Sequence, residues 1–268
     1  MTTGQFASAT LVDRQDETSW RSTIEPGWDI AGNANGGYLL AIAVRALLGA
    51  TGRPDPVTVT AHFLNPGKPG PVEIDTEVIK EGRRFANASA VVRSDGRPLL
   101  SVLGTVGDLS EAGDDLLVDG APPELPSPER CVFIEATDTF PPPFMGKVEL
   151  FVHPDDMGFA GHIKSGIPRV TGWFRLPGDE PVDTVGLLCA LDAFPPTIFN
   201  ADLPVAWTPT VELTTHIRAR PAPGWLRCRF TTRFITGGFL EEDGEVWDST
   251  DRLVAQSRQL ALVPRAHS

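Results

Sequence analysis

Basic residues are scarce in this chain, and long apolar runs are missing. Its 268 residues include 23 Lys and Arg against 35 Asp and Glu, which gives a formal net charge of −12. A protein of that charge repels phosphate backbones and anionic lipids, so we expect no nucleic-acid partner and no membrane-surface role. No segment approaches the roughly 18 consecutive apolar residues of a transmembrane helix, so we also expect no membrane insertion.

Cysteine and the common catalytic motifs are scarce or absent too. Cys131, Cys189 and Cys228 lie far apart and form no CxxC pair, which is typical of reduced core cysteines in a cytoplasmic protein. The N-terminus has no basic region followed by an apolar stretch, so we expect no signal peptide. The sequence contains no HExxH motif, GxSxG elbow, P-loop or dinucleotide fingerprint, and we expect neither a metal ion nor an organic cofactor.

The chain repeats itself once. Residues 57–106 are similar to residues 211–260 at an offset of 154, which also places the apolar segment 35–48 over the segment 189–202. The period-2 alternation within each half predicts strands, and the apolar segment predicts one buried helix per half. This order predicts an α+β protein with a double hotdog fold, in which two antiparallel sheets, each wrapped around one long helix, are joined side by side.

The segment between the two similar halves is acidic and rich in proline, which is typical of a surface linker. We therefore expect an N-terminal hotdog repeat at residues 1–110, a linker at residues 111–130 and a C-terminal hotdog repeat at residues 131–268.

Several segments resemble the acyl-CoA thioesterase II (TesB-like) family. They are "NGGYLLAIAVRAL", "HFLNPG" and "EGRRFANASAVVRSDGRPL" in the first half, and "LDAF", "PTVELTTHIRARP" and "LVAQSRQLAL" in the second. Together they cover most of the chain in the family's order. The resemblance implies hydrolysis of fatty acyl-CoA thioesters to free acid and CoA without a cofactor. It is also compatible with a homodimer or a higher oligomer.

The resemblance also assigns three catalytic positions. They are Asp192 on the second apolar helix, Thr210 on the following strand and Gln259 on the last strand. Glu212 stands where the family usually carries an aspartate. The neighbouring Thr208 leaves open which of the two hydroxyls takes part.

Asp192 lies on the apolar stripe of the expected second helix, four residues after Leu188. Burying an ionised carboxylate without partners costs several kcal/mol, so the side chain must face a polar pocket or be tied by hydrogen bonds. Two interpretations stay open: a structural aspartate that braces the "FPP" turn, and a general base that faces a cleft.

Strand alternation places Gln259 on a face whose other members are small, which suits a crevice with room for a ligand or a water molecule. An exposed polar face on an edge strand is the alternative. Thr210 is expected on a face with Glu212, Thr214 and His216, where threonine is also common for packing reasons alone.

The start of the first apolar helix is a candidate oxyanion and substrate site. Asn35 precedes two glycines, and unpaired N–H groups at a helix start attract developing negative charge. We expect the amides of Gly37 and Tyr38 to form an oxyanion hole, although an ordinary turn before a helix would give the same sequence. Arg83 and Arg84 are either CoA-phosphate contacts or part of a hairpin turn.

The acyl chain is expected between the two halves, against Leu39, Phe194 and Phe199. The offset of 154 equates Asp192 with Tyr38 and Gln259 with Thr105, so we expect one working site per chain.

The hypothesis is therefore that acyl-CoA is the substrate and that Asp192, Thr210 and Gln259 activate a water molecule. Two alternatives remain open. One is a hotdog enoyl-CoA hydratase, whose sites typically pair a carboxylate with a histidine. The other is a non-catalytic acyl-CoA-binding protein.

Overall fold

The computed structural model describes residues 4–111, 117–138, 140–161 and 163–264. The helices are α1 (Gln5–Ala9), α2 (Gly36–Thr51) and α3 (Gly186–Ala190). The short 3-10 helices are η1 (Leu109–Glu111), η2 (Pro128–Arg130), η3 (Pro143–Lys147), η4 (Pro154–Asp156), η5 (Gly158–Gly161), η6 (Pro177–Asp179) and η7 (Thr197–Asn200).

The strands of the first half are β1 (Asp13–Arg14), β2 (Ser19–Ile24), β3 (Asp29–Ile30), β4 (Asn33–Ala34), β5 (Asp55–Phe63), β6 (Gly70–Glu81), β7 (Ala86–Ser94) and β8 (Arg97–Gly107). Those of the second half are β9 (Val132–Phe133), β10 (Glu149–Val152), β11 (Arg169–Arg175), β12 (Thr210–Ile217), β13 (Leu226–Thr231), β14 (Ile235–Thr236), β15 (Phe239–Trp247) and β16 (Leu253–Leu262).

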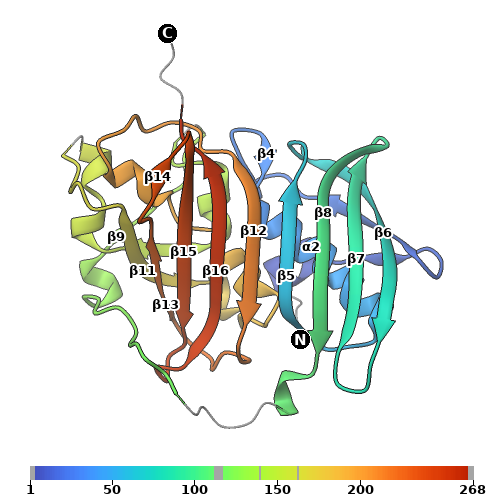
Figure 1. Ribbon diagram of the computed structural model, residues 1–268. Helices are drawn as coiled ribbons and strands as arrows, with labels where there is room; N and C mark the ends of the chain where they lie inside the picture. The colour runs from blue at the N-terminus through green and yellow to red at the C-terminus, as the bar shows by residue number, and fades with distance from the viewer. Residues whose placement is uncertain (1–3, 112–116, 139, 162, 265–268) are drawn as a thin grey trace.

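One antiparallel sheet runs through both halves. Its order is β1-β2-β6-β7-β8-β5-β12-β16-β15-β13-β11-β10-β9, with β14 attached to β15. Strands β5 and β12 pair antiparallel at the junction of the halves, near the centre of Figure 1. We expected two sheets side by side, but the strands of both halves form a single continuous sheet. Pairing β5 with β12 satisfies the backbone groups that two separate sheets would leave exposed as edges.

The sequence repeat is visible at this junction. Thr60 pairs with Thr214, which is its own equivalent at the offset of 154, and the two hydroxyl oxygens lie 2.9 Å apart. The offset exchanges the pairs on either side: Leu213 faces Ala61, and their equivalents Val59 and Thr215 face each other. A pseudo-twofold axis therefore passes between β5 and β12, and the offset read from the sequence is confirmed for these two strands.

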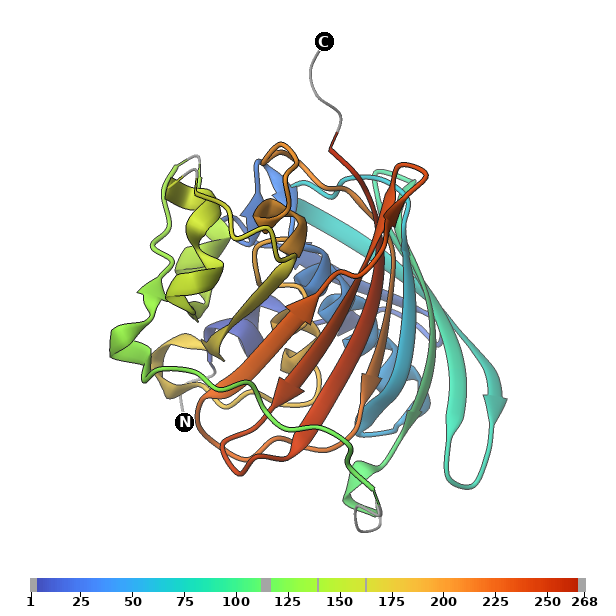
Figure 2. The same ribbon diagram turned by 60° about the vertical axis from the view of Figure 1, so that its left-hand side comes forward.

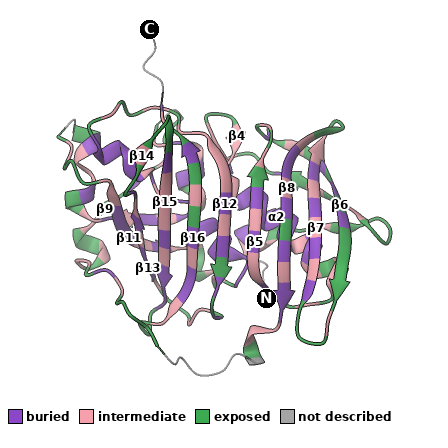
Figure 3. Ribbon diagram, in the orientation of Figure 1, coloured by how far each residue is buried: buried purple, intermediate pink, exposed green. Residues whose placement is uncertain are grey.

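Helix α2 lies on the concave side of the sheet, which curves around it (Figure 2). The side chain of Asn35 caps its start by accepting a hydrogen bond from the Tyr38 amide at 2.9 Å, and Gly52, at φ 64°, ends it in the left-handed conformation. The residues from Tyr38 to Val44 are all buried, as the apolar sequence predicted. In Figure 3 the strands in front of it show buried and more exposed residues in alternation.

The second half has no helix of comparable length among its described residues. Helix α3 has only five residues, and a turn at Leu191 and Asp192 follows it. The expectation of one long helix in each half is therefore wrong for the second half. Asp192 is a poor residue for a helix interior, and the two prolines at 195 and 196 cannot continue one because they lack the N–H group and clash with the preceding turn.

Helix α3 packs against the start of α2 at a very close distance. A Cβ atom on Gly37 would lie 2.5 Å from the backbone oxygen of Leu188 and 2.9 Å from Cβ of Asp192. Glycine is therefore required at this position, and the contact brings the turn after α3 onto the N-terminal end of α2.

The expected linker lies only partly within the described residues, because residues 112–116 fall outside them. Residues 117–127 form neither helix nor strand and run along the second half, where Trp173 Nε1 donates to the Pro126 carbonyl at 2.8 Å. The division at 1–110, 111–130 and 131–268 stays a prediction, with the sheet continuous across it.

Candidate active site

A cavity of about 930 Å³ opens between the two halves. It lies where β5 ends and β12 begins, and both halves contribute to its wall. The first half supplies Ile30, Ala34, Asn35, Gly36, Leu39 and residues 63–67, and the second supplies Ile134, Met145, Met157, Phe159, residues 191–196, Phe199, residues 205–210, Phe230, Leu240, Glu242, Gln259 and Ala261. Most of these side chains are apolar, so the cavity suits an apolar ligand with a few polar contacts.

Asp192 faces this cavity from the turn after α3. Its Oδ2 atom accepts hydrogen bonds from the Gly37 amide at 2.8 Å and from Asn35 Nδ2 at 3.0 Å. Asn35 Nδ2 also donates to the Asp192 carbonyl at 2.9 Å. No hydrogen bond to Oδ1 is seen within the described residues. Asp192 is thus held by hydrogen bonds, as a structural aspartate would be. It also faces a cleft, as a general base must.

Burial raises the pKa of Asp192 to about 6, although the donors Gly37 and Asn35 oppose that rise by stabilising the ionised form. At neutral pH the carboxylate is therefore mostly ionised and is more basic than an ordinary aspartate. A group with these properties is suited to general-base chemistry.

The hydrogen bonds at this helix start correct the expectation for the oxyanion hole. The Gly37 amide donates to Asp192, and the Tyr38 amide donates to Asn35 Oδ1 at 2.9 Å. Both N–H groups are therefore engaged with side chains of the protein. Gly36 and Gly37, the first two residues of α2, allow a carboxylate to approach closely, and that carboxylate is Asp192.

Gln259 and Thr210 form a pair in the same cavity. Gln259 Nε2 donates to Thr210 Oγ1 at 2.5 Å. The neighbouring Thr208 also lines the cavity, but its hydroxyl donates to the Ala206 carbonyl at 3.1 Å. Of the two hydroxyls that the sequence left open, that of Thr210 contacts Gln259.

A β-bulge turns Thr210 into the cavity. Glu212 pairs with Leu260 and Thr210 pairs with Ala261, so Val211 is an extra residue in β12. The extra residue moves Thr210 to the inner face that carries Gln259, whereas Glu212 stays on the outer face. The expectation that Thr210 shares a face with Glu212, Thr214 and His216 is wrong for this reason.

Glu242 is a residue of the cavity that sequence reasoning missed. It lies on β15 directly opposite Gln259 on β16. Its neighbours on the same face, Leu240, Gly244 and Val246, are all buried. This alternation within "FLEEDGEVW" was the signal that could have identified Glu242 as an inward-facing acid.

Arg83 and Arg84 do not line the cavity. They lie in the turn between β6 and β7, at the lower end of the sheet in Figure 1, whereas the cavity lies at the end of β5, at the upper edge. The guanidinium of Arg84 stacks on Phe85, 5.1 Å from the ring centroid. The hairpin interpretation therefore fits them, and the suggestion that they contact CoA phosphates has no support from their position.

The first half has no counterpart of the site within its described residues. The residue that corresponds to Gln259 by pairing is Gly104, opposite Val59, one position from the Thr105 expected from the sequence. A Cβ on Gly104 would lie 3.1 Å from Leu47, so the space is filled. Tyr38 is fully buried, stacks on Trp28 and donates its hydroxyl hydrogen bond to the Ala9 carbonyl at 2.9 Å.

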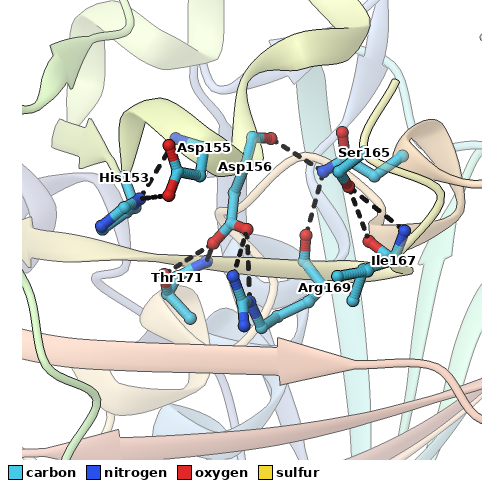
Figure 4. A network of polar contacts seen from close by, with 8 residues as sticks. His153, Asp155, Asp156, Ser165, Ile167, Arg169 and Thr171 are labelled. Atoms are coloured by element: carbon cyan, nitrogen blue, oxygen red, sulfur yellow. Dashed lines mark hydrogen bonds and ion pairs between the residues drawn. The ribbon is translucent and has the colours of Figure 1, made fainter. Parts of the chain in front are cut away.

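A buried polar network anchors the outer wall of the cavity (Figure 4). The carboxylate of Asp156 accepts hydrogen bonds from Arg169, from the Thr171 amide at 2.9 Å and from the Thr171 hydroxyl at 2.6 Å. Asn200 Nδ2 donates to the carbonyls of Asp156 and Arg169 at 2.8 and 2.9 Å. The network holds η4 and η7 together, and the side chain of Phe199 on η7 faces the cavity.

Comparisons with known proteins agree with this arrangement. The acyl-CoA thioesterase N-terminal domain family matches residues 24–107, and the acyl-CoA thioesterase C-terminal domain family matches residues 123–263. An uncharacterized protein of Mycobacterium tuberculosis (strain H37Rv) is 32% identical over 259 residues, which cover 88% of each chain. A crystal structure of a candidate thioesterase II from Thermobifida fusca is 32% identical, with a TM-score of 0.90 and 99% of each chain covered.

A second solved structure, a hot dog fold protein from Alicyclobacillus acidocaldarius, is 19% identical with a TM-score of 0.86 over 99% of this chain and all of the other. The fold is therefore of the hotdog class. The two domain families together cover most of the chain, so it belongs to the acyl-CoA thioesterase family and is a thioesterase.

None of the described helices is long and apolar enough to cross a membrane. No group of three or more metal-ligating side chains occurs in the part of the chain that the structure describes.

Proposed function

We propose that this protein hydrolyses acyl-CoA thioesters to free acid and CoA with water activated by Asp192, Thr210 and Gln259. The observation that carries the proposal is the meeting of these three side chains on one apolar cavity between the halves. Domain-family membership supports the reaction class, and the geometry supports the assignment of roles.

Asp192 is the general base of this mechanism. Its Oδ2 atom is fixed by Gly37 and Asn35, which leaves Oδ1 to accept a hydrogen bond from a water molecule. The fixed orientation reduces the reorganisation needed when the water loses its proton.

Thr210 and Gln259 orient the reacting groups. Because Gln259 Nε2 donates to Thr210 Oγ1, the hydroxyl hydrogen of Thr210 remains available for the water or for the substrate. The second N–H of Gln259 Nε2 is available in the same way. We assign oxyanion stabilisation to these two donors, since the amides of Gly37 and Tyr38 are engaged; removal of one such donor typically costs about 3–4 kcal/mol of barrier.

The acyl chain occupies the apolar part of the cavity. Leu39 from α2 and Phe194 and Phe199 from the second half all line it, which supports this placement. Burial of the chain there would contribute about 0.8 kcal/mol per methylene to binding.

The test is an assay of thiol release with acyl-CoA substrates of several chain lengths, run beside an enoyl-CoA hydration assay. The proposal predicts thiol release without hydration. Hydration without thiol release would instead support a hydratase, and binding with neither reaction would support an acyl-CoA-binding protein. The hydratase has little support here: no histidine is among the described residues that line the cavity, and His62 and His216 are exposed.

A further inference from the structure

Glu242 is a second carboxylate in the cavity, and the mechanism above leaves it without a role. Both the amide and the hydroxyl of Thr197 donate to its Oε2 atom, at 2.8 Å each. The Thr197 hydroxyl lies 2.7 Å from that of Thr232. One oxygen of Glu242 is therefore anchored directly to Thr197 on η7 and, through it, to Thr232 just after β13.

The other oxygen, Oε1, has no hydrogen-bond partner among the described residues, and it is not sealed in the protein interior. Asp192 has the same arrangement, with Oδ2 anchored and Oδ1 free. Glu241, the neighbour of Glu242 on the outer face, differs: its two oxygens accept hydrogen bonds from the amides of Arg233 and Phe234. Glu241 is thus engaged through both of its oxygens, whereas each carboxylate of the cavity has one oxygen without a protein donor among the described residues.

We propose that Glu242 is the general acid of the site and delivers a proton to the sulfur that leaves the acyl carbon. The inference rests on the proposed thioester hydrolysis. Water would lose a proton to Asp192 as its oxygen bonds to the acyl carbon. The C–S bond would then break with its electron pair on sulfur, and the O–H bond of Glu242 would break to form the thiol. The proton held by Asp192 returns to Glu242 through solvent, so atoms and charge balance.

The charges around Glu242 favour its protonated form. Asp192 faces it from the turn after α3, Gln259 from β16 and Thr197 from η7, and none of them is a cation. Arg233 and Arg258 pair with Glu241 and Asp243 on the outer face of the sheet. No cation in the described part of the cavity wall compensates a negative charge on Glu242.

Burial raises the pKa of Glu242 to about 7, and repulsion from Asp192 adds to the rise while the Thr197 donors oppose it. Asp192, with a pKa of about 6, ionises first. Around neutral pH one carboxyl of the pair is therefore ionised and the other carries a proton, which is the arrangement that acid–base catalysis requires. Since a thiol has a pKa of roughly 8.5, a carboxyl of this acidity can protonate a thiolate.

The variant Glu242→Gln tests this role. The amide oxygen of glutamine can accept both Thr197 hydrogen bonds, so the local structure is preserved while the titrating proton is removed. We expect kcat/KM for acyl-CoA to fall about 10²-fold near pH 6.5. The wild-type profile should be bell-shaped, with a rise set by Asp192 and a fall set by Glu242, and the variant should lose the fall at alkaline pH.

Glu245→Gln is the matched control, because Glu245 lies on the same strand, faces outward and pairs with Arg229. It should keep the bell-shaped profile. If Glu242→Gln keeps wild-type turnover and the alkaline fall, the acid role is overturned and thioester hydrolysis stands. If the wild-type protein releases no thiol from any acyl-CoA, both proposals fall.

Direct titration gives a readout that does not depend on turnover. Carbon-13 carboxyl NMR of the glutamates, with the Glu242 resonance identified by its loss in Glu242→Gln, should show Glu242 titrating near neutral pH. Titration of Glu242 in the ordinary range of glutamate would overturn the proposal.

Discussion

At the scale of single residues, the site depends on how each polar group is anchored. Asp192 and Glu242 each have one oxygen fixed by the protein and one turned to the cavity. Thr210 accepts from Gln259 and so keeps its own proton to donate. Some polar atoms of the site are thus held by the protein, and others are left to contact a ligand. Substitution of one side chain at a time can test each assignment.

The hydroxyl of Thr210 can be tested against that of Thr208. Thr210→Val preserves the shape of the side chain but removes the donor, and we expect kcat/KM for acyl-CoA to fall by about 10²- to 10³-fold. Thr208→Val should keep near-wild-type turnover, since its hydroxyl is used by the Ala206 carbonyl. The measurement is thiol release at saturating and limiting substrate. A larger loss in Thr208→Val than in Thr210→Val would contradict the assignment.

Sequence reasoning reached Asp192, Thr210 and Gln259 but could not see their hydrogen bonds. The energy of burying a carboxylate correctly demanded a partner for Asp192, but that partner, the Gly37 amide, is 155 positions away in the chain. The same amide had been expected to bind the oxyanion. Which donor serves which acceptor is decided by tertiary contacts that periodicity does not contain.

At the scale of elements, the site is formed where a long helix and a short one meet. The start of α2 lies against the turn after α3, and the bulge in β12 brings Thr210 to the same face as Gln259. The apolar run of α2 and the alternation of β16 could be read from the sequence. Pro195 and Pro196 also signal the early end of α3. The extra residue Val211 could not be read, because it does not change the local pattern of apolar residues.

Gly37 tests the contact between the two helices. In Gly37→Ala the new Cβ would lie 2.5 Å from the backbone oxygen of Leu188, which cannot move without shifting α3. We expect a loss of about 1–3 kcal/mol in the free energy of unfolding, typical of overpacking, with a drop in kcat. Chemical denaturation and thiol release check these two effects.

Gly146→Ala is the control for this substitution, because its Cβ would lie 3.5 Å from Ala136, an ordinary contact. Equal stability of Gly37→Ala and Gly146→Ala would show that the close packing of α2 and α3 is not required.

At the scale of the whole molecule, two similar halves share one sheet and one cavity. The pairing of Thr60 with Thr214 places the pseudo-twofold axis at the junction. The second half supplies both carboxylates of the site as well as Thr210 and Gln259, whereas Asn35 comes from the first half. The first half contributes the end of a helix and part of the apolar wall. In the first half, the space opposite Val59 is occupied by Leu47, which packs against Gly104, so there is no room there for a counterpart of Gln259.

The two cavity carboxyls make stability depend on pH. The folded-state pKa values of Asp192 and Glu242, about 6 and about 7, lie above the reference values of 3.8 and 4.5. The folded state therefore binds more protons than the unfolded state between pH 4 and 7, so their contribution to stability falls as pH rises through that window and is constant above it.

The double variant Asp192→Asn/Glu242→Gln removes the loss of stability that ionisation of the two carboxyls causes at high pH. It should unfold at a Tm at least about 2 °C above that of the wild-type protein at pH 8, with the difference shrinking toward pH 4. Asp183→Asn/Glu245→Gln is the control and should show no such gain. A double variant that is less stable than the wild type at pH 8 would contradict the raised pKa values.

The most direct test of the account is thiol release by Asp192→Asn beside the wild-type protein and Asp183→Asn, which alters an aspartate at the other end of α3 that contacts Arg45. Asparagine keeps an acceptor for the Gly37 amide but cannot take a proton from water. The account predicts that Asp192→Asn unfolds cooperatively like the wild type and loses about 10²- to 10⁴-fold in kcat for acyl-CoA, while Asp183→Asn keeps its activity. An Asp192→Asn protein that turns over acyl-CoA at the wild-type rate would contradict it.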